Sequence, residues 1–415
     1  MLFKLNAVGK NIDNEKFFNL NLYFDSERFK IFSELKEHNK FIKKYPYIEQ
    51  KPYTNLRTGF PYILKIYLGN ACNFNCKYCR QSSHDKKKHR TKEELDNFIK
   101  TIHESIDITN LEDIEYWGGE PLLYWNEIKY LSENFKFNKK ISYKITTNGS
   151  LITNEIANYL IENKFKIVLS HDGPGQILRG DDPFDFPNAK ELWRKVYFAL
   201  NKLGLFSINN LITEQSHNFQ DILEYHQNIF DKDILFNKME AVISYTDNAN
   251  EINRTYSSNF SDDWFASLCK SDDYERVAQY RSWFDMFLSR LKDNNYILNR
   301  YCSRCTEYIK HSVCVDLNYN IVPCQVFGDT NISLGKLTKT YLQDINEKLP
   351  MYMKDRYKCN YCIVAPVCHG LCPYLEEKYA EQDCATKFQY NYAIFRYFIF
   401  KLFGVIIVNY EEVMS

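Results

Sequence analysis

The sequence lacks an excess of charge of either sign. Its 415 residues include 53 Lys and Arg against 53 Asp and Glu. Proteins that hold nucleic acid or anionic membranes by long-range attraction carry a net positive field, and this composition supplies none. We therefore expect neither a nucleic-acid partner nor a membrane partner, and no long-range steering of a small charged substrate.

Long uninterrupted apolar runs are scarce as well. The N-terminal residues, Met1–Asn6, do not begin a charged segment followed by a long apolar run, so a secretory signal is not expected and we predict a cytoplasmic protein. The most apolar stretch, residues 394–408, is interrupted by Arg396 and Lys401 and is short for a membrane span. We expect a C-terminal helix at residues 386–415 that packs on the body.

A repeating pattern of short apolar runs and longer amphipathic stretches extends from about residue 62 to residue 243. This alternation is typical of parallel strands joined by crossover helices. The predicted strands are Tyr62–Leu68, Asp113–Trp117, Ile141–Thr146, Lys166–Ser170, Leu205–Leu211 and Ile234–Ile243. Six such units make an incomplete version of the eight-unit barrel, so we predict an α/β fold built on a partial (β/α)6 TIM barrel.

Helix starts and domain boundaries follow from the same pattern. Thr91 with Glu94 predicts a capping box, and Asn188 with Glu191 repeats that signal before a second apolar face. With 45% hydrophobic residues, the chain can bury large cores in two or three domains. We expect an N-terminal extension that is a candidate partner-recognition element, then the barrel, a cysteine-rich domain and the C-terminal helix, at residues 1–61, 62–290, 291–385 and 386–415.

Cysteine is abundant, and nine of the 13 cysteines follow residue 300. In a reducing cytoplasm, closely spaced cysteines are more readily metal ligands than disulfide partners. Cys72, Cys76 and Cys79 directly follow the first predicted strand, so their thiols can converge at the barrel mouth. Three thiolates supply three of the four protein bonds of a 4Fe-4S cluster and leave one iron open. A zinc site or ordinary buried thiols are the alternatives.

The spacing Cys72-x3-Cys76-x2-Cys79, with the aromatic Tyr78 before the last cysteine, resembles the signature of the radical S-adenosylmethionine (SAM) superfamily. The resemblance implies that the amino and carboxylate groups of SAM chelate the open iron. It also implies that an electron from the reduced cluster cleaves SAM to a 5′-deoxyadenosyl radical. No catalytic residue is assigned beyond the ligands of this cluster.

Loops after the next three strands are similar to further family motifs. Gly118-Gly119-Glu120-Pro121 looks like the family's GGEP motif, where bare backbone and a carboxylate meet SAM. Taken singly, an Asn-Gly pair is often just a turn, and Arg179 is equally well explained by a surface salt bridge. The resemblance implies SAM contacts from Tyr78, Gly118, Gly119, Glu120, Thr147, Asn148, Ser170, Asp172 and Arg179.

The C-terminal cysteines resemble the SPASM domain of radical SAM peptide-modifying enzymes, with Tyr319 at the position of an expected glycine. A hairpin is still expected there, through Asn318 or Asn320. Cys314 and Cys269 are interpreted as ordinary small buried residues. By analogy, auxiliary cluster I takes Cys305, Cys324 and Cys372, with Cys302 as a candidate fourth ligand, and auxiliary cluster II takes Cys359, Cys362, Cys368 and Cys384.

Two points about these clusters stay open in the sequence. Without Cys302, auxiliary cluster I keeps an open iron that a substrate could bind. The pairs Cys302/Cys305 and Cys359/Cys362 could alternatively bind one zinc ion as a ribbon. The resemblance as a whole implies three 4Fe-4S clusters and SAM as cofactors.

The resemblance implies a maturase that installs a carbon–carbon or thioether crosslink in a ribosomally made precursor peptide. We expect a flavodoxin- or ferredoxin-type reductant as partner, and a monomer or weak dimer. Sulfatase maturases, the alternative, carry an acidic base after the cysteine that matches Cys324, where this chain has Gln325. An amide has no useful pKa as a base, although Asp316 or Asp329 could substitute. A non-catalytic iron–sulfur or zinc scaffold that binds peptide is a second alternative.

Overall fold

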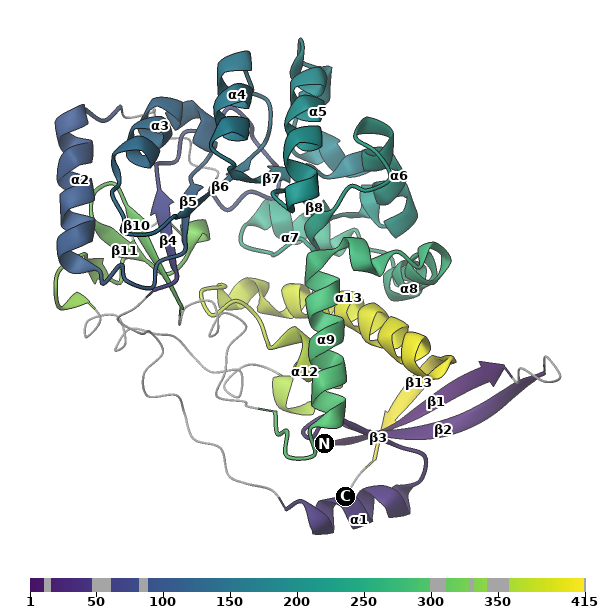
Figure 1. The fold of residues 1–415 in the computed structure, drawn as a ribbon. Coiled ribbons are helices and arrows are strands. Elements are labelled where there is room, and N and C mark those ends of the chain that lie inside the picture. Colours follow the sequence, from purple (N-terminus) through teal and green to yellow (C-terminus); the bar gives the residue numbers. More distant parts are fainter. Residues whose placement is uncertain are drawn as a thin grey trace.

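The structure is a computed structural model that describes residues 1–10, 16–46, 61–81, 89–298, 311–327, 332–341 and 358–413. Two sheets organise these residues (Figure 1). The large sheet has nine strands in the order β12-β11-β10-β4-β5-β6-β7-β8-β9. The small sheet has four strands in the order β13-β1-β2-β3.

Six neighbouring strands of the large sheet run parallel, as expected from the alternating pattern. Their bounds lie within two residues of the predicted ones, and the predicted α/β partial barrel is confirmed. The six strands are β4 Ile63–Tyr67, β5 Asp113–Trp117, β6 Ser142–Thr147, β7 Lys166–Ser170, β8 Phe206–Ile212 and β9 Phe236–Ala241.

Crossover helices follow these strands and cover the outer face of the sheet (Figure 1). The helices around the barrel are α2 Lys92–Ser105, α3 Trp125–Asn134, α4 Asn154–Glu162, α5 Ala189–Leu200, α6 Phe219–Ile229, α7 Asp247–Arg254, α8 Phe260–Ser271 and α9 Ala278–Lys292. The helices α2 to α6 each bury apolar side chains, which is the usual packing of helices on a parallel sheet. Short 3-10 turns are η1 Pro121–Tyr124, η2 Gly173–Leu178, η3 Pro183–Asp185, η4 Asn201–Leu203, η5 Glu214–Ser216, η6 Tyr274–Arg276, η7 Gln325–Phe327 and η9 Cys359–Tyr361.

The capping box predicted at α2 is present. The backbone N–H of Glu94 donates to the Thr91 hydroxyl at 3.2 Å, and the backbone N–H of Thr91 donates to the Glu94 carboxylate at 2.8 Å. We expect Thr91→Ala to lower the free energy of unfolding by about 1 kcal/mol, because a helix N-terminus loses its acceptor. Chemical denaturation measures this, with Thr91→Ser as the control that should lose little. Equal losses in the two variants would contradict the role of the cap.

The second predicted helix start is wrong in one respect. Asn188 stands at the N-cap of α5, but its φ is 62° and its side chain makes no capping hydrogen bond. A left-handed backbone turns the side chain away from the first helical N–H groups, so no capping box with Glu191 forms. The predicted apolar face is nevertheless buried, with Leu192, Val196 and Leu200 in the core.

Strands from the cysteine-rich region extend the barrel sheet. β10, Ser312–Asp316, pairs in parallel with β4, and β11, Asn320–Val322, and β12, Gly335–Lys336, follow as antiparallel neighbours. The expected hairpin therefore forms between β10 and β11. Its left-handed position is occupied by Tyr319 itself, at φ 65°, and the Asp316 carboxylate accepts two turn N–H groups at 2.8 Å.

The two ends of the described chain meet in the small sheet. It consists of β1 Leu2–Lys10, β2 Phe17–Asp25, β3 Lys30–Phe32 and β13 Val405–Glu412, with the helix α1 Leu35–Lys44 after β3. β13 pairs antiparallel with β1 along its length. The small sheet packs against the long helix α13, for example through Phe24 on Phe395.

The single C-terminal helix expected at residues 386–415 is corrected. The helix α13 spans Glu377–Phe403, after the short α12 at Ala365–Cys368, and a strand replaces the rest. Gly404, at φ 66°, ends the helix in the left-handed conformation that glycine adopts without a steric cost. The apolar run after Gly404 consists of β-branched residues. It pairs with β1 and so forms a strand instead of extending the helix.

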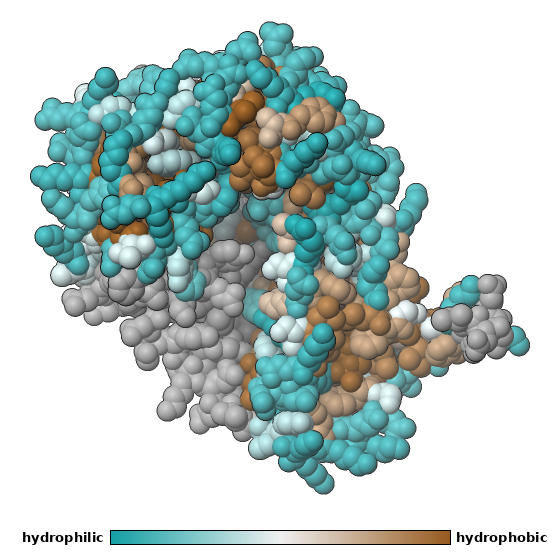
Figure 2. Space-filling model, in the orientation of Figure 1, coloured by the Kyte–Doolittle hydropathy of each residue, from teal (hydrophilic) through white to brown (hydrophobic). Residues whose placement is uncertain are grey.

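The surface is polar over the barrel helices and more apolar around the small sheet and α13 (Figure 2). Exposed apolar side chains there include Phe403, Ile406 and Val408, and Val408 is 58% exposed. In the part of the chain that the structure describes, no helix is both long enough and apolar enough to span a bilayer.

Candidate functional site

The three cysteines of the predicted cluster lie on the loop after β4, and each is partly exposed. The backbone N–H of Phe74 faces the Cys72 sulfur at 3.4 Å, and the backbone N–H of Gln81 faces the Cys79 sulfur at 3.3 Å. Such N–H groups stabilise cluster thiolates. Burial, together with the charges of Glu120, Cys76 and Cys79, raises the pKa of Cys72 to about 12. The three thiols are therefore electrostatic neighbours that need a cation to ionise, which fits metal ligation.

The segment Gly118–Glu120 after β5, the GGE segment, pairs with the loop after β4 that carries the three cysteines, the cysteine loop. The N–H of Gly119 donates to the Gly69 carbonyl at 2.9 Å, and the N–H of Glu120 donates to the Ala71 carbonyl at 2.8 Å. A Cβ on Gly119 would lie 2.4 Å from the carbonyl oxygen of Asn70. Real Cβ atoms do not approach a backbone oxygen so closely, so the two loops can meet only through glycine.

The carboxylate of Glu120 joins the loops after β5 and β6. It is 1% exposed and accepts from the Thr147 hydroxyl at 2.6 Å, the Asn148 backbone N–H at 2.7 Å and the Leu122 backbone N–H at 2.9 Å. Burial raises the pKa of Glu120 in spite of these three donors. The structure thus brings together three of the residues that the sequence assigns to SAM contacts.

Three further predicted SAM contacts, Tyr78, Asp172 and Arg179, lie together. Asp172 is two residues beyond Ser170, which ends β7. The Tyr78 hydroxyl donates to Asp172, and the Arg179 guanidinium lies 3.1 Å from the Tyr78 oxygen and 3.6 Å from the Asp172 carboxylate. The side chain of Arg179 is only 12% exposed, so it is not a surface salt bridge. Its Nε has no hydrogen-bond partner among the described residues. A ligand carboxylate would satisfy this donor.

The C-terminal cysteines form two neighbouring groups. Burial and the nearby thiols of Cys368, Cys384 and Cys359 together raise the pKa of Cys362 to about 12, so these four thiols are electrostatic neighbours. That proximity supports the set predicted for auxiliary cluster II, which stays a prediction. The described ligands predicted for auxiliary cluster I, Cys324 and Cys372, share an apolar cluster with Phe327 and Leu371, and Cys384 packs against the same cluster. The other two predicted ligands, Cys302 and Cys305, lie outside the described residues.

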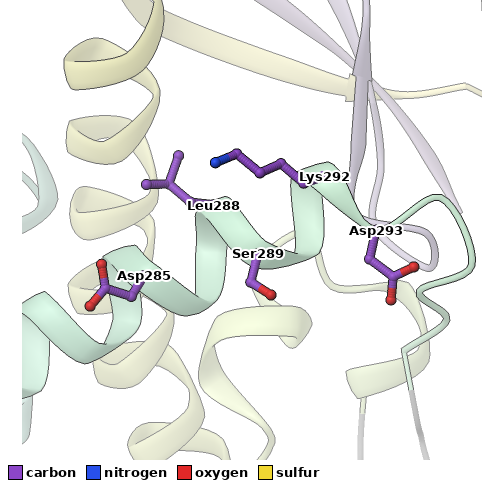
Figure 3. A pocket seen from close by; sticks show the side chains of 5 residues that line it. All are labelled: Asp285, Leu288, Ser289, Lys292 and Asp293. Atoms are coloured by element: carbon purple, nitrogen blue, oxygen red, sulfur yellow. The ribbon is translucent and has the colours of Figure 1, made fainter.

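Within the ranges described, no three His, Cys, Asp or Glu side chains are grouped as closely as the ligands of a single metal ion. A surface hollow of about 570 Å³ lies along α9 and is lined by Asp285, Leu288, Ser289, Lys292 and Asp293 (Figure 3). None of the predicted site residues lines it. It is therefore separate from the site at the barrel mouth.

Sequence reasoning missed a layer of charge in the barrel sheet. Lys65, Glu115 and Lys144 face each other on adjacent strands, with Glu115 within 3.5 Å of Lys65 and 3.0 Å of Lys144. Burial, the largest influence, raises the pKa of Glu115, but the two ammonium groups outweigh it and the pKa is lowered. A charged residue in the middle of each of three neighbouring predicted strands was the available signal.

It also missed a contact between the residues that follow two predicted cluster ligands. The side-chain amide of Gln81, two residues after Cys79, donates at 3.0 Å to the carbonyl oxygen of Gln325, the residue after Cys324. The Gln325 side-chain oxygen in turn accepts from Lys65 Nζ at 3.2 Å. The loops predicted to hold two different clusters therefore touch, and no local sequence signal predicts this.

A buried histidine pair supports the loop of Asp172. His171 lies 3.1 Å from His226 and 3.3 Å from the Asp182 carboxylate, while the second nitrogen of His226 faces the Ile222 carbonyl at 2.8 Å. Burial, together with the charge of His171, lowers the pKa of His226 to about 3. Asp182 has a pKa lowered to about 2, because His171 and two further donors outweigh its burial.

We expect the cluster-free protein to lose stability as the pH falls from about 6.5 toward 3. In that window the unfolded chain protonates His226 and the folded chain does not, so folding is disfavoured by up to about 1.4 kcal/mol per pH unit. Urea unfolding at pH 7, 6 and 5 measures the slope. His226→Gln does not titrate and should flatten it, whereas an unchanged slope in that variant would contradict the prediction.

Comparisons with known proteins identify a matching family model and several similar proteins. Residues 66–257 match the family model of the Radical SAM superfamily. Radical SAM cyclopropyl synthase TigE of Paramaledivibacter caminithermalis is 28% identical over 207 residues, which cover 45% of this chain and 43% of TigE. The cysteine-type anaerobic sulfatase-maturating enzyme of Clostridium perfringens strain 13 is 24% identical over 353 residues, which cover 76% of this chain and 89% of that enzyme. The alignment thus spans less than half of the length of TigE.

Solved structures share the fold. Native anSMEcpe with bound AdoMet superposes with a TM-score of 0.53 and 19% identity, covering 81% of this chain and 98% of that chain. The similarity reaches beyond the barrel, because 81% of this chain is more than residues 66–257 comprise. At this identity the likeness concerns the fold alone.

Proposed function

We propose that this chain is a radical SAM enzyme that modifies a peptide, because residues 66–257 match the family model of the Radical SAM superfamily. The observation that carries the proposal is the loop after β4, where three thiols lie beside the GGE segment and the free Nε of Arg179. These groups fit a 4Fe-4S cluster with SAM chelated at its open iron. When bound, the cluster and SAM supply a 5′-deoxyadenosyl radical that abstracts a substrate hydrogen atom.

The chain's own residues would bind and orient SAM. Gly118 and Gly119 let the GGE segment lie against the cysteine loop, because a Cβ on either would meet a backbone carbonyl oxygen of that loop. Arg179 would hold the SAM carboxylate through its unpartnered Nε while Asp172 fixes the guanidinium. Glu120, held by Thr147 and Asn148, fixes the relative position of two loops around SAM.

A peptide substrate is supported by what the relatives' names describe. A sulfatase-maturating enzyme acts on a protein, and a cyclopropyl synthase forms a carbon–carbon ring. We propose ring closure within a precursor peptide, by a carbon–carbon bond in preference to a thioether. Closing the ring after hydrogen abstraction releases one proton and one electron, and the electron would pass to an auxiliary cluster. The two auxiliary clusters and a flavodoxin- or ferredoxin-type reductant belong to this proposal.

Sulfatase maturation is the second candidate, favoured by the 89% coverage of the Clostridium perfringens enzyme. Gln325 opposes it. Its amide oxygen accepts from Lys65, and an amide cannot take the proton that formylglycine formation releases. The alternative bases are Asp316, whose carboxylate is engaged by the hairpin turn, and Asp329, which lies outside the described residues.

The test is anaerobic reconstitution with iron and sulfide, followed by SAM and dithionite. We expect broad absorption near 400 nm, about twelve irons per chain and formation of 5′-deoxyadenosine. Cys76→Ala should abolish 5′-deoxyadenosine and remove about four irons. Colourless zinc-loaded protein, or bound cluster and SAM without turnover, would instead favour the binding scaffold.

The substrate is identified by mass spectrometry of short peptides encoded beside the gene, each incubated with the reconstituted enzyme. A loss of two hydrogen atoms from one of them is the expected product of ring closure. A formylglycine product from a sulfatase peptide would establish the second candidate. The scaffold alternative predicts no mass change in any peptide.

A further inference from the structure

Two lysines on the barrel sheet share a single carboxylate. Lys65 Nζ lies 3.5 Å from one Glu115 oxygen and Lys144 Nζ lies 3.0 Å from the other, and the Trp117 indole N–H also donates to Glu115 at 3.0 Å. In the described part of the chain, no other acidic side chain lies within 4.0 Å of either ammonium. The group therefore carries one surplus positive charge.

The surplus charge is largely withdrawn from water. The side chains of Lys65 and Lys144 are only 13% and 22% exposed, and that of Glu115 is 7% exposed. Removing a charge from water is costly unless a partner compensates it. Because both lysines retain some exposure, a ligand can reach them. The arrangement leaves a place for one further negative charge.

This place lies directly below the mouth of the barrel. Lys65 and Glu115 pair in the strand register, and two residues further along the same strands Tyr67 pairs with Trp117. Those two residues end β4 and β5, and the cysteine loop and the GGE segment begin immediately after them. The charged group is therefore one layer of side chains below the proposed radical-forming site.

Gln325 connects Lys65 to the cysteine loop without neutralising its charge. Its side-chain oxygen accepts from Lys65 Nζ at 3.2 Å, and its carbonyl oxygen accepts from the Gln81 amide at 3.0 Å. Gln81 in turn holds the Cys79 sulfur through its backbone N–H. An amide at position 325 contributes a dipole and no charge, so the surplus remains for a ligand.

We propose that Lys65 and Lys144 bind a carboxylate of the peptide substrate and so place the residue to be modified beneath the radical. This specificity site rests on the peptide-modifying function proposed above. A carboxylate suits it, because its oxygens can accept from both ammonium groups and cancel one charge. The carboxylate can come from an Asp or Glu side chain or from the C-terminus of the peptide.

The test is ligand-observed saturation-transfer NMR on the reconstituted, oxidised enzyme with SAM bound. The probes are acetyl-aspartate N-methylamide for the side chain, acetylglycine for the chain terminus and acetyl-asparagine N-methylamide as the neutral control. We expect one of the two carboxylates to bind at least tenfold more tightly than the asparagine probe, and the better one names the source. Equal binding of all three would overturn the proposal.

Gln325→Glu is the decisive variant, because it supplies the missing charge from within a side chain of nearly equal shape. This variant should lower the affinity of the preferred carboxylate probe at least tenfold, and Lys144→Met should lower it by a similar factor. Lys129→Met, which removes a surface lysine paired with Glu155, is the matched control and should leave binding unchanged. An unaltered affinity in Gln325→Glu would refute the site.

Bound SAM and its cleavage to 5′-deoxyadenosine are measured in each variant. Normal values show that the protein is folded and the radical machinery intact, so a change in probe affinity reports the carboxylate site alone. Failure of wild-type protein to cleave SAM would instead contradict the proposed function. The two hypotheses therefore fail by different measurements.

Discussion

Gly119→Ala should slow SAM cleavage by roughly 100-fold. The new Cβ would lie 2.4 Å from the Asn70 carbonyl oxygen and 2.5 Å from that of Ala71, and both are backbone atoms that cannot rotate away. The cysteine loop or the GGE segment must therefore shift. A displacement of about 1 Å in a reacting geometry costs roughly 100-fold in rate, and overpacking costs about 1–3 kcal/mol of stability.

The measurement is 5′-deoxyadenosine formation by the reconstituted variant, with iron content determined alongside. Gly204→Ala is the control, since a Cβ there meets nothing within 4 Å, although this glycine has a positive φ of 68°. It should lose about 1 kcal/mol of stability through backbone strain and keep its activity. Comparable activity in the two variants would show that contact between the loops is not needed.

Asp383→Ala, in α13, should lower the free energy of unfolding of the protein strongly. Asp383 is fully buried, lies 2.7 Å from the Lys387 ammonium and accepts the Ser244 backbone N–H at 2.9 Å. Removing the carboxylate leaves a buried ammonium without a counter-charge. Breaking one partner of a buried ion pair costs about 3–5 kcal/mol.

Urea unfolding of the cluster-free protein measures this loss. The double variant Asp383→Ala/Lys387→Met removes both charges and should recover much of it, because no unpaired ion remains. Glu376→Ala breaks an exposed pair with Lys378 and should change stability by less than about 1 kcal/mol. If Asp383→Ala were as mild as Glu376→Ala, the buried pair would have no structural importance.

The parallel part of the fold was predictable from the sequence because its signals are local. Each of the six strands is a short apolar run before an amphipathic helix, and the turn from Thr91 into α2 carries its own cap. The cysteine loop and the GGE segment were predictable for a similar reason, since their spacing follows directly after β4 and β5. Strand order then brings the two loops together.

Long-range pairing was not predictable. The run Val405–Val408 is as apolar as the end of α13, and only its pairing with β1 makes it a strand. The parallel pairing of β10 with β4 likewise depends on residues far apart in the chain. Tyr319 was recognised as a departure from glycine, but its left-handed backbone, with the ring beside Phe98 at 5.9 Å, required the structure.

The charged layer shows why part of the site was missed. Lys65 and Lys144 each look like an isolated polar residue in a buried strand, and their common partner Glu115 lies on the strand between them. Register alone aligns the three. A sequence motif search finds residues that are close together along the chain. These three residues are far apart in the sequence and meet only across adjacent strands of the sheet.

The pairing of β1 with β13 also has a consequence for biosynthesis. Phe3 pairs with Glu412, so β1 leaves the ribosome long before its partner β13 has been made. Until then the apolar residues of β1, among them Phe3 and Leu5, have no β13 beside them. Such delayed, non-local pairing is slow and exposes an unpaired strand edge to other chains. Protein production should therefore depend on chaperones that shield this strand during synthesis.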